Sequence, residues 1–290
     1  MTQSSSPLDS LPPMGRLLEI GAVVADLAAA SRRLTTLFQG SASRVISEPN
    51  FRMDIQMCRA HDTDFEIMYS ADPDSLIGRY LHRSGEGLHH VAFQVPDARQ
   101  AMTAFRASGV PPLAQEPVRL DNLLAFFLPP KQFGGILFEF IENLHTWIDG
   151  APMPLPDPAS IPDDGIRVRG LGARVADLQA TMRSFSELLG ANNSEVFVDD
   201  VLGVKACISR VANIEFKLME PIDASKVHPL LAKGHALQHV RVDALNVEAA
   251  IARAARSGVQ FPAQEGCAIR CSDPRSCHGL VFEMLARDSR

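Results

Sequence analysis

The chain has 290 residues, with 28 Lys or Arg against 34 Asp or Glu, so its formal net charge is −6. This acidic balance, without a basic run, argues against nucleic acid and anionic membranes as main partners. No apolar stretch reaches the ~18 residues of a membrane span, and the start lacks the basic and apolar regions of a signal peptide. Five cysteines, an odd number in a long chain, suit a reducing compartment. We therefore expect a cytoplasmic protein with room for two globular domains.

The first half of the chain predicts two helices, each followed by strands. The first 14 residues are rich in Ser and Pro and are expected to form a disordered tail. An apolar run, an Asp and an amphipathic helical pattern follow at 17–40, and the same succession returns at 87–110. Alternation of apolar and polar residues predicts strands at 51–58, 63–70, 122–128 and 134–141.

A Pro-rich segment at 149–165 separates this half from the rest of the chain. Its five prolines prevent a helix and favour an extended, semi-rigid linker. We therefore expect one domain at 15–148 and another at 166–290.

The second half repeats the first. Three blocks match in the same order at a near-constant offset, namely 17–40 with 168–191, 87–110 with 236–259, and 129–142 with 273–286. Each half contains two segments in which a strand leads through an Asp into a helix. That Asp is well suited to accept the unpaired N–H groups of the first helical turn. The candidate caps are Asp26, Asp97, Asp177 and Asp243. The sequence thus predicts an α+β fold of four βαβββ modules.

Two motifs in the first half are more specific than this general pattern. One reads GEGLHHVAF at 85–93, and the other reads PKQFGGILFEF at 130–140. Both resemble motifs of methylmalonyl-CoA epimerases, and the modules resemble the vicinal oxygen chelate superfamily, which also includes glyoxalases, bleomycin resistance proteins and extradiol dioxygenases. The resemblance implies two glyoxalase-like domains with open, curved mixed sheets. It also implies a cup into which four strand positions direct metal ligands.

The implied ligand positions of the first half can be carried over one by one. The second His of the His-His pair falls on His90, and the Glu of the last strand falls on Glu139. The acidic position on the strand before the Gly-Glu-Gly loop falls on Glu66. The first-strand ligand is usually His in the family, and Glu19 stands there in this chain. Glu19 is therefore a departure from the family pattern.

The matching positions of the second half are Gly170, Lys217, His239 and Glu283. Gly170 has no ligating side chain, and the Lys217 ammonium would repel a cation. Two ligands are too few for a tight divalent site, so the second cup is expected to be vestigial, structural or a binding surface. If each cup were built from both halves, His239 and Glu283 would join Glu19 and Glu66 in one cup. His90 and Glu139 would then join Gly170 and Lys217 in the other. The stronger motifs of the first half favour the unswapped set.

Three carboxylates and one imidazole suit a divalent ion such as Mn²⁺, Co²⁺, Ni²⁺, Zn²⁺ or Mg²⁺. Iron fits less well, because ring-cleaving iron oxygenases use two His and one carboxylate. Such an ion would stabilise an enolate-like intermediate of a small oxygenated substrate, CoA-linked or carbonyl-bearing. Glu139 is then a candidate base, and Glu48 a candidate second base. The sequence favours a metal-dependent isomerase, epimerase or lyase. A ligand-sequestering protein and an extradiol-type dioxygenase are the alternatives, and a homodimer is left open.

Two other groups of residues have structural interpretations. The spacing of Cys267, Cys271, Cys277 and His278 lacks the paired knuckles of a zinc site, which favours structural thiols. Phe126 and Phe127 are expected to line the core, with substrate contact open to one of them.

Overall fold

The computed structural model describes residues 11–61, 63–120, 123–142, 145–148, 151–154, 165–232, 234–262 and 270–287. Most of the predicted tail, most of the predicted linker and Cys267 lie outside these residues. No helix within the described ranges is both long and apolar enough to cross a membrane.

The elements of each half follow one another in a repeated order. In the first half they are β1 (Leu17–Val23), α1 (Leu27–Phe38), β2 (Ile46–Glu48), β3 (Met53–Ala60), β4 (Thr63–Tyr69), α2 (Leu76–Ser84), β5 (Gly87–Val95), α3 (Ala98–Ala107), β6 (Val118–Leu120), β7 (Leu123–Leu128), the 3-10 helix η2 (Pro130–Phe133), β8 (Leu137–Glu142), β9 (His145–Ile148) and β10 (Ala151–Pro154). In the second half they are β11 (Arg167–Arg174), α4 (Leu178–Leu189), β12 (Asn192–Asn193), β13 (Phe197–Asp199), β14 (Val204–Val211), β15 (Ile214–Pro221), η4 (Pro229–Leu231), β16 (Leu237–Ala244), α5 (Val247–Arg256), β17 (Arg270–Cys271), η5 (Pro274–Ser276) and β18 (Phe282–Ala286).

Each half supplies one mixed sheet. The first sheet has the strand order β2-β3-β4-β1-β5-β8-β7-β6. Within it, β1 and β4 are parallel, and so are β5 and β8. In both pairs the first strand of a module lies beside its last strand. The hairpins β3–β4 and β7–β8 are antiparallel.

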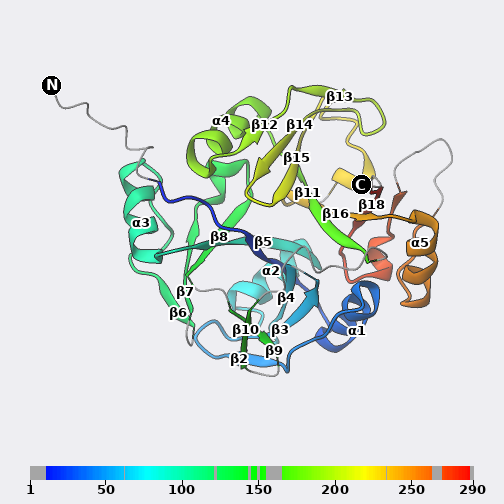
Figure 1. Cartoon of the computed structure of the whole chain (residues 1–290), viewed down its shortest axis with the longest axis horizontal. Coiled ribbons are helices and arrows are strands. Elements are labelled where there is room, and N and C mark those ends of the chain that lie inside the picture. Colours follow the sequence, from blue (N-terminus) through cyan, green and yellow to red (C-terminus); the bar gives the residue numbers. More distant parts are fainter. Residues whose placement is uncertain are drawn as a thin grey trace. The chain divides into compact units, whose positions relative to one another are not determined.

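The second sheet repeats this topology. Its order is β12-β14-β15-β11-β16-β18-β17, with β13 also paired to β14. β16 and β18 are parallel like β5 and β8, and β14 and β15 form an antiparallel hairpin like β3 and β4. The predicted duplication and the predicted glyoxalase-like α+β fold are therefore confirmed (Figure 1).

Three of the four predicted helix caps are confirmed. The carboxylates of Asp26, Asp97 and Asp177 accept the N–H groups of Ala29, Gln100 and Ala180 at 2.9, 2.8 and 2.8 Å. Each bond satisfies a donor of the first turn that has no partner within the helix.

The fourth predicted cap, Asp243, is wrong. β16 continues to Ala244, so Asp243 is still a strand residue, and α5 begins at Val247. Asn246 caps α5 instead and accepts the Ala249 N–H at 3.0 Å. Asp243 is buried and accepts a hydrogen bond from Arg287 Nε at 2.6 Å.

By contacts, the chain packs as two compact units, and each unit draws on both halves. The first unit comprises residues 1–18, 90–144 and 172–236, and the second comprises 19–89, 145–171 and 237–290. The predicted boundaries at 15–148 and 166–290 follow the two sheets and stay a prediction.

The core of the first unit is a cluster of buried phenylalanines from both halves. Phe138 of β8 lies 5.7 Å from Phe185 of α4, measured between ring centroids. Phe185 in turn lies 5.3 Å from Phe216 of β15. All three side chains are fully buried. α4 therefore covers its own hairpin and also packs on β8, the last strand of the first sheet in chain order.

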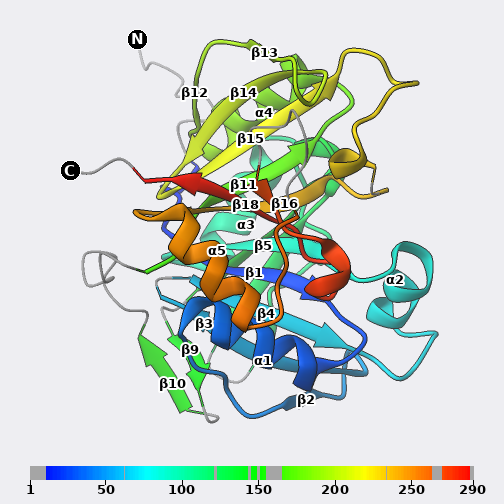
Figure 2. The same cartoon turned by 90° about the vertical axis from the view of Figure 1, so that its right-hand side faces the viewer.

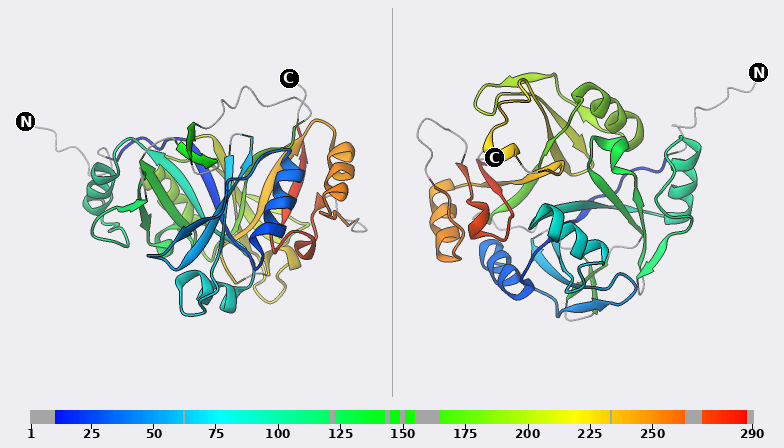
Figure 3. Two further views of the ribbon diagram at one scale, coloured as in Figure 1. Left: turned by 90° about the horizontal axis from the view of Figure 1, so that it is seen from below. Right: turned by 180° about the vertical axis from the view of Figure 1, so that it is seen from behind.

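The second unit has an equivalent aromatic core. The centroid of Phe282 in β18 lies 5.7 Å from that of Phe38 in α1 and 6.1 Å from that of Phe65 in β4. α1 and α5 lie side by side (Figure 2), and Arg33 Nη1 donates to the Ser257 carbonyl at 3.1 Å. Figure 3 shows the red segment that contains β18 between the blue α1 and the orange α5. Helices from the two ends of the chain thus share one core.

The sequence does not predict α2 or the β9–β10 hairpin. α2 begins after Ser75, whose hydroxyl accepts the Gly78 N–H at 2.8 Å. That cap, followed by Ile77 and Leu81 one turn apart, is the signal that indicates the helix. Ala151–Pro154 falls in the segment predicted as linker and pairs antiparallel with β9. Proline is tolerated there because both strands of this hairpin are edge strands.

Candidate metal centre

Four predicted ligands come together on one face of the first sheet. Glu19, Glu66, His90 and Glu139 each offer one ligand atom, and these atoms all lie within 4.8 Å of one another. They stand on the neighbouring strands β1, β4, β5 and β8. This is the set expected from the unswapped pairing.

The strand register explains why these side chains share a face. Glu66 is in register with Gly21 of β1, two residues after Glu19, so both glutamates point to the same side. Glu139 is likewise in register with Ala92 of β5, two residues after His90. The residues beside Glu66 and Glu139 are therefore glycine and alanine, which leave room between the longer side chains.

The cluster is secluded from solvent. Glu19, His90 and Glu139 are 9%, 2% and 5% exposed, and Glu66 is half-buried. His90 Nε2 lies 3.0 Å from Glu139 Oε2. The ring of Phe127, which is in register with Glu139, meets the His90 ring edge-on at 5.7 Å between centroids. Phe127 therefore faces the site, whereas Phe126 is fully buried against Phe105 and Phe140 on the other face.

This donor set fits a divalent cation. Buried carboxylates repel one another and lose their hydration, so a positive charge nearby or proton uptake stabilises their grouping. Three carboxylates and one imidazole provide the oxygen-rich ligand set typical of Mg²⁺ or Mn²⁺, with a nitrogen that also suits Zn²⁺, Co²⁺ or Ni²⁺. The same four residues would hold the ion.

An apolar wall adjoins Glu66. Met57 is in register with Glu66 and therefore shares its face. It belongs to a buried cluster with partly buried hydrophobics packed against it, namely Val23, Ile55, Met57, Met68 and Ile77 with Met53, Tyr80 and Leu81. Burial raises the pKa of Tyr80 to about 12, so its hydroxyl stays protonated and donates to the Leu88 carbonyl at 2.7 Å. α2 thus presents its apolar side chains to the strands beside the cluster.

The Gly-Glu-Gly loop before β5 is fixed by its central residue. Glu86 Oε1 accepts the Ala25 N–H at 2.8 Å and lies 3.2 Å from His278 Nδ1. Gly279 passes so close that a Cβ there would lie 2.2 Å from the Glu86 carbonyl oxygen. Gly85, with φ of 71°, ends α2 in a conformation that favours glycine. These contacts hold the start of the strand that carries His90.

The sequence profile of the glyoxalase/bleomycin resistance protein/dioxygenase superfamily matches residues 19–126 and again 171–270. The chain belongs to this superfamily. Among curated proteins, mitochondrial methylmalonyl-CoA epimerase of Mus musculus is 27% identical over 139 residues, which are 47% of this chain and 76% of that protein. The Homo sapiens protein of the same name is 24% identical over 144 residues, or 48% of this chain and 82% of that one.

A solved structure matches nearly the whole length of this chain. A mutant of 4-hydroxymandelate synthase from Streptomyces coelicolor has a TM-score of 0.72 over 96% of this chain and 94% of that chain. The identity is 17%, so this likeness establishes the shared fold alone.

In the second sheet, basic side chains pair with the acidic side chains Asp199 and Glu283. Lys217 Nζ donates to Asp199 Oδ2 at 2.7 Å, with both side chains largely buried. Glu283 Oε2 lies 3.4 Å from His239 Nε2 and accepts a hydrogen bond from Arg241 Nε at 2.8 Å. The only potential metal cluster among the described residues is the one in the first sheet.

The Asp199–Lys217 pair has a clear electrostatic signature. Burial opposes ionisation of Asp199, but hydrogen bonds from the Lys217 ammonium and the Leu202 N–H outweigh it and hold the pKa of Asp199 below its usual value. The carboxylate is therefore ionised at neutral pH and keeps the buried ammonium neutralised.

Glu48 and the cysteines among the described residues lie outside the cluster. Glu48 is in register with Met53, whereas Glu66 is in register with Met57, which separates the two glutamates by about 13 Å along β3. Glu48 Oε1 accepts the Asn50 N–H at 3.2 Å. A role of Glu48 as second base stays a prediction.

Burial raises the pKa of Cys277 to about 12, as expected for an unreactive structural thiol.

Proposed function

We propose that this protein is a metal-dependent isomerase or epimerase, with a lyase as the related option, acting on a small oxygenated substrate. The grouping of Glu19, Glu66, His90 and Glu139 supports this function. These residues would hold one divalent ion, which would stabilise negative charge on a carbonyl oxygen of the substrate.

Glu139 is the proposed base. It removes a proton from the carbon next to the substrate carbonyl, and the C–H electron pair moves toward that carbonyl. His90 Nε2 lies 3.0 Å from Glu139 Oε2, and the Phe127 ring meets the His90 ring edge-on beside this pair. Return of a proton to the opposite face completes an epimerisation, whereas loss of a neighbouring group completes a lyase reaction.

The proposed substrate is an acyl group with an apolar part, linked to CoA or bearing a carbonyl. The buried cluster of Val23, Ile55, Met57 and Met68 adjoins Glu66 and makes the surroundings of the proposed site apolar, which favours such a group. The two curated relatives are methylmalonyl-CoA epimerases by name, which makes methylmalonyl-CoA the first substrate to try.

Metal content measured on purified protein tests the proposal. We expect about one divalent ion per chain in the wild type and none in His90→Ala. His239→Ala is the matched control, because His239 is also a fully buried strand histidine beside a glutamate. This variant should keep the ion.

Proton exchange tests the chemistry separately. The metal-loaded protein should exchange the C2 proton of methylmalonyl-CoA with D₂O, as followed by NMR, and Glu139→Gln should not. No metal after incubation with excess ion would contradict the proposal and favour a ligand-sequestering protein. Stoichiometric iron with aerobic ring cleavage would favour the dioxygenase. Metal without exchange would contradict the CoA-linked substrate.

A further inference from the structure

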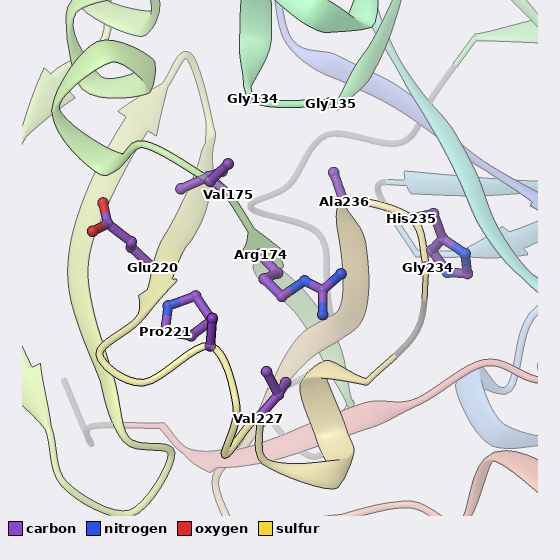
Figure 4. Close-up of a pocket in the computed structure, with 12 residues that line it drawn as sticks. Gly134, Gly135, Arg174, Val175, Glu220, Pro221, Val227, Gly234, His235 and Ala236 are labelled. Carbon is purple, nitrogen blue, oxygen red and sulfur yellow. The ribbon is translucent and has the colours of Figure 1, made fainter.

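A cavity lies in the first unit, and none of the four candidate metal ligands lines it. Its volume is about 610 Å³, within the usual range of small-molecule pockets. The ends of β11 and β15 line it together with the loop before β16 and the Gly134–Gly135 turn after η2 (Figure 4).

Most of the lining of this cavity is apolar or glycine. It includes Val175, Pro221, Val227 and Ala236, and the side chain of Val227 points toward Arg174 in Figure 4. Gly134 has φ of 65°, and a Cβ there would lie 2.7 Å from the Thr181 hydroxyl oxygen. The glycine turn can therefore approach α4 closely and form one wall without side chains.

Arg174 is the cation in the middle of this lining (Figure 4). The residue is half-buried, and its Nη1 donates to the Leu231 carbonyl at 2.8 Å. No carboxylate of the described residues forms an ion pair with it. Glu220 also lines the cavity, but its Oε2 accepts the Leu178 N–H at 2.7 Å and its carboxylate points away from Arg174.

The rest of the polar lining does not offer an alternative anchor. Glu220 already accepts the Leu178 N–H in the first turn of α4, and the His235 ring is turned away from Arg174 (Figure 4). The cavity therefore combines one planar, fork-shaped cation with an apolar surround. A half-buried guanidinium without a counterion is stabilised by an anion that binds beside it.

We propose that this cavity binds a small organic anion with an apolar body, whose carboxylate or phosphate group pairs with Arg174. The site is independent of the proposed metal centre. The second repeat has Gly170 and Lys217 at positions that match metal ligands of the first. This cavity gives that repeat a binding role that does not depend on metal.

Matched probes test this site on the full chain in the presence of EDTA. Heptanoate and hexyl phosphate share a hexyl chain and differ in the anionic group, and hexanol lacks the charge. We expect saturable binding of at least one anion by calorimetry, and at least tenfold weaker binding of hexanol. The better anion identifies the group that the site prefers.

Three variants locate the binding. Arg174→Met should weaken the better anion by about tenfold or more, and Val227→Phe should weaken it by filling the cavity while Arg174 is retained. Lys226→Met is the control, because Lys226 is an exposed cation on the same loop, and it should bind like the wild type. Binding that is absent in the wild type, or that survives both Arg174→Met and Val227→Phe, would overturn the proposal.

Discussion

The substitution Glu19→Gln separates a metal ligand from a structural acid. It keeps the shape of the side chain and removes one negative charge from the cluster. If Glu19 binds metal, the variant should be more stable than the wild type without metal and less stable with it. A merely structural glutamate predicts no such reversal.

The geometry sets the size of this effect. Two unit charges at 4.8 Å, the outer limit for the ligand atoms, repel by about 3.5 kcal/mol at an effective dielectric constant of 20. Proton uptake and the neighbouring His90 offset part of this repulsion. We therefore expect a gain of about 1–3 kcal/mol in the metal-free protein, or roughly 2–10 °C in Tm. Metal affinity should fall by more than the ~10–100-fold typical of losing an outer-shell partner.

Thermal unfolding in EDTA and in excess Mn²⁺ or Zn²⁺, with calorimetric titration of the ion, provides the assay. Glu142→Gln is the control, since Glu142 lies on β8 and accepts the Ala98 N–H at 3.0 Å outside the cluster. It should leave metal affinity unchanged. A Glu19→Gln variant that loses stability in EDTA and keeps its metal affinity would refute the ligand role.

Four further predictions concern the Asp199–Lys217 pair, the α4 cap and the apolar wall beside Glu66. Asp199→Asn should cost about 3–5 kcal/mol of unfolding free energy, because it leaves the Lys217 ammonium buried without a counterion, and the double variant with Lys217→Met should recover most of that loss in urea unfolding. Since Lys217 lowers the pKa of Asp199, the stability from this pair should be present at neutral pH and disappear in acid as Asp199 protonates, so a pH series in which the wild type and the double variant keep a constant difference down to pH 2 would contradict it. Asp177→Ala should lower the unfolding free energy by about 1 kcal/mol through loss of the α4 cap, while Asp177→Asn should nearly restore it. Met57→Gln should raise the KM for an apolar acyl substrate more than it lowers kcat, and an unchanged KM would exclude Met57 from the substrate surface.

Local rules predict most of the fold from the sequence. The strand–Asp–helix pattern locates three of the four caps, and the duplication locates both sheets. The pattern misplaces the fourth cap because Asp243 and Asn246 are both good cap residues, and the packing of Asp243 against Arg287 decides between them. The sequence does not predict α2 because the helix is short. Its apolar residues pack against the apolar wall beside Glu66.

The candidate metal ligands can be predicted because they lie in sequence motifs. The Arg174 cavity cannot, because segments far apart in the sequence form it. His90 and Glu139 lie in motifs, and strand alternation then places Glu66 and Glu19 on the same face. The Arg174 cavity has no comparable pattern. It depends on a glycine turn from the first half meeting strand ends from the second, which no periodicity indicates.

The mixed composition of the two units bears on how a duplicated chain is held together. Phe38 and Phe65 meet Phe282, and Phe138 meets Phe185, so each repeat completes its core with side chains from the other. A separately expressed repeat would expose these rings and could bury them only by associating with a second polypeptide. Covalent fusion replaces that bimolecular step with an intramolecular one, in which each repeat meets the other at an effective concentration of roughly millimolar. The two repeats are then free to diverge, because neither has to recognise a copy of itself.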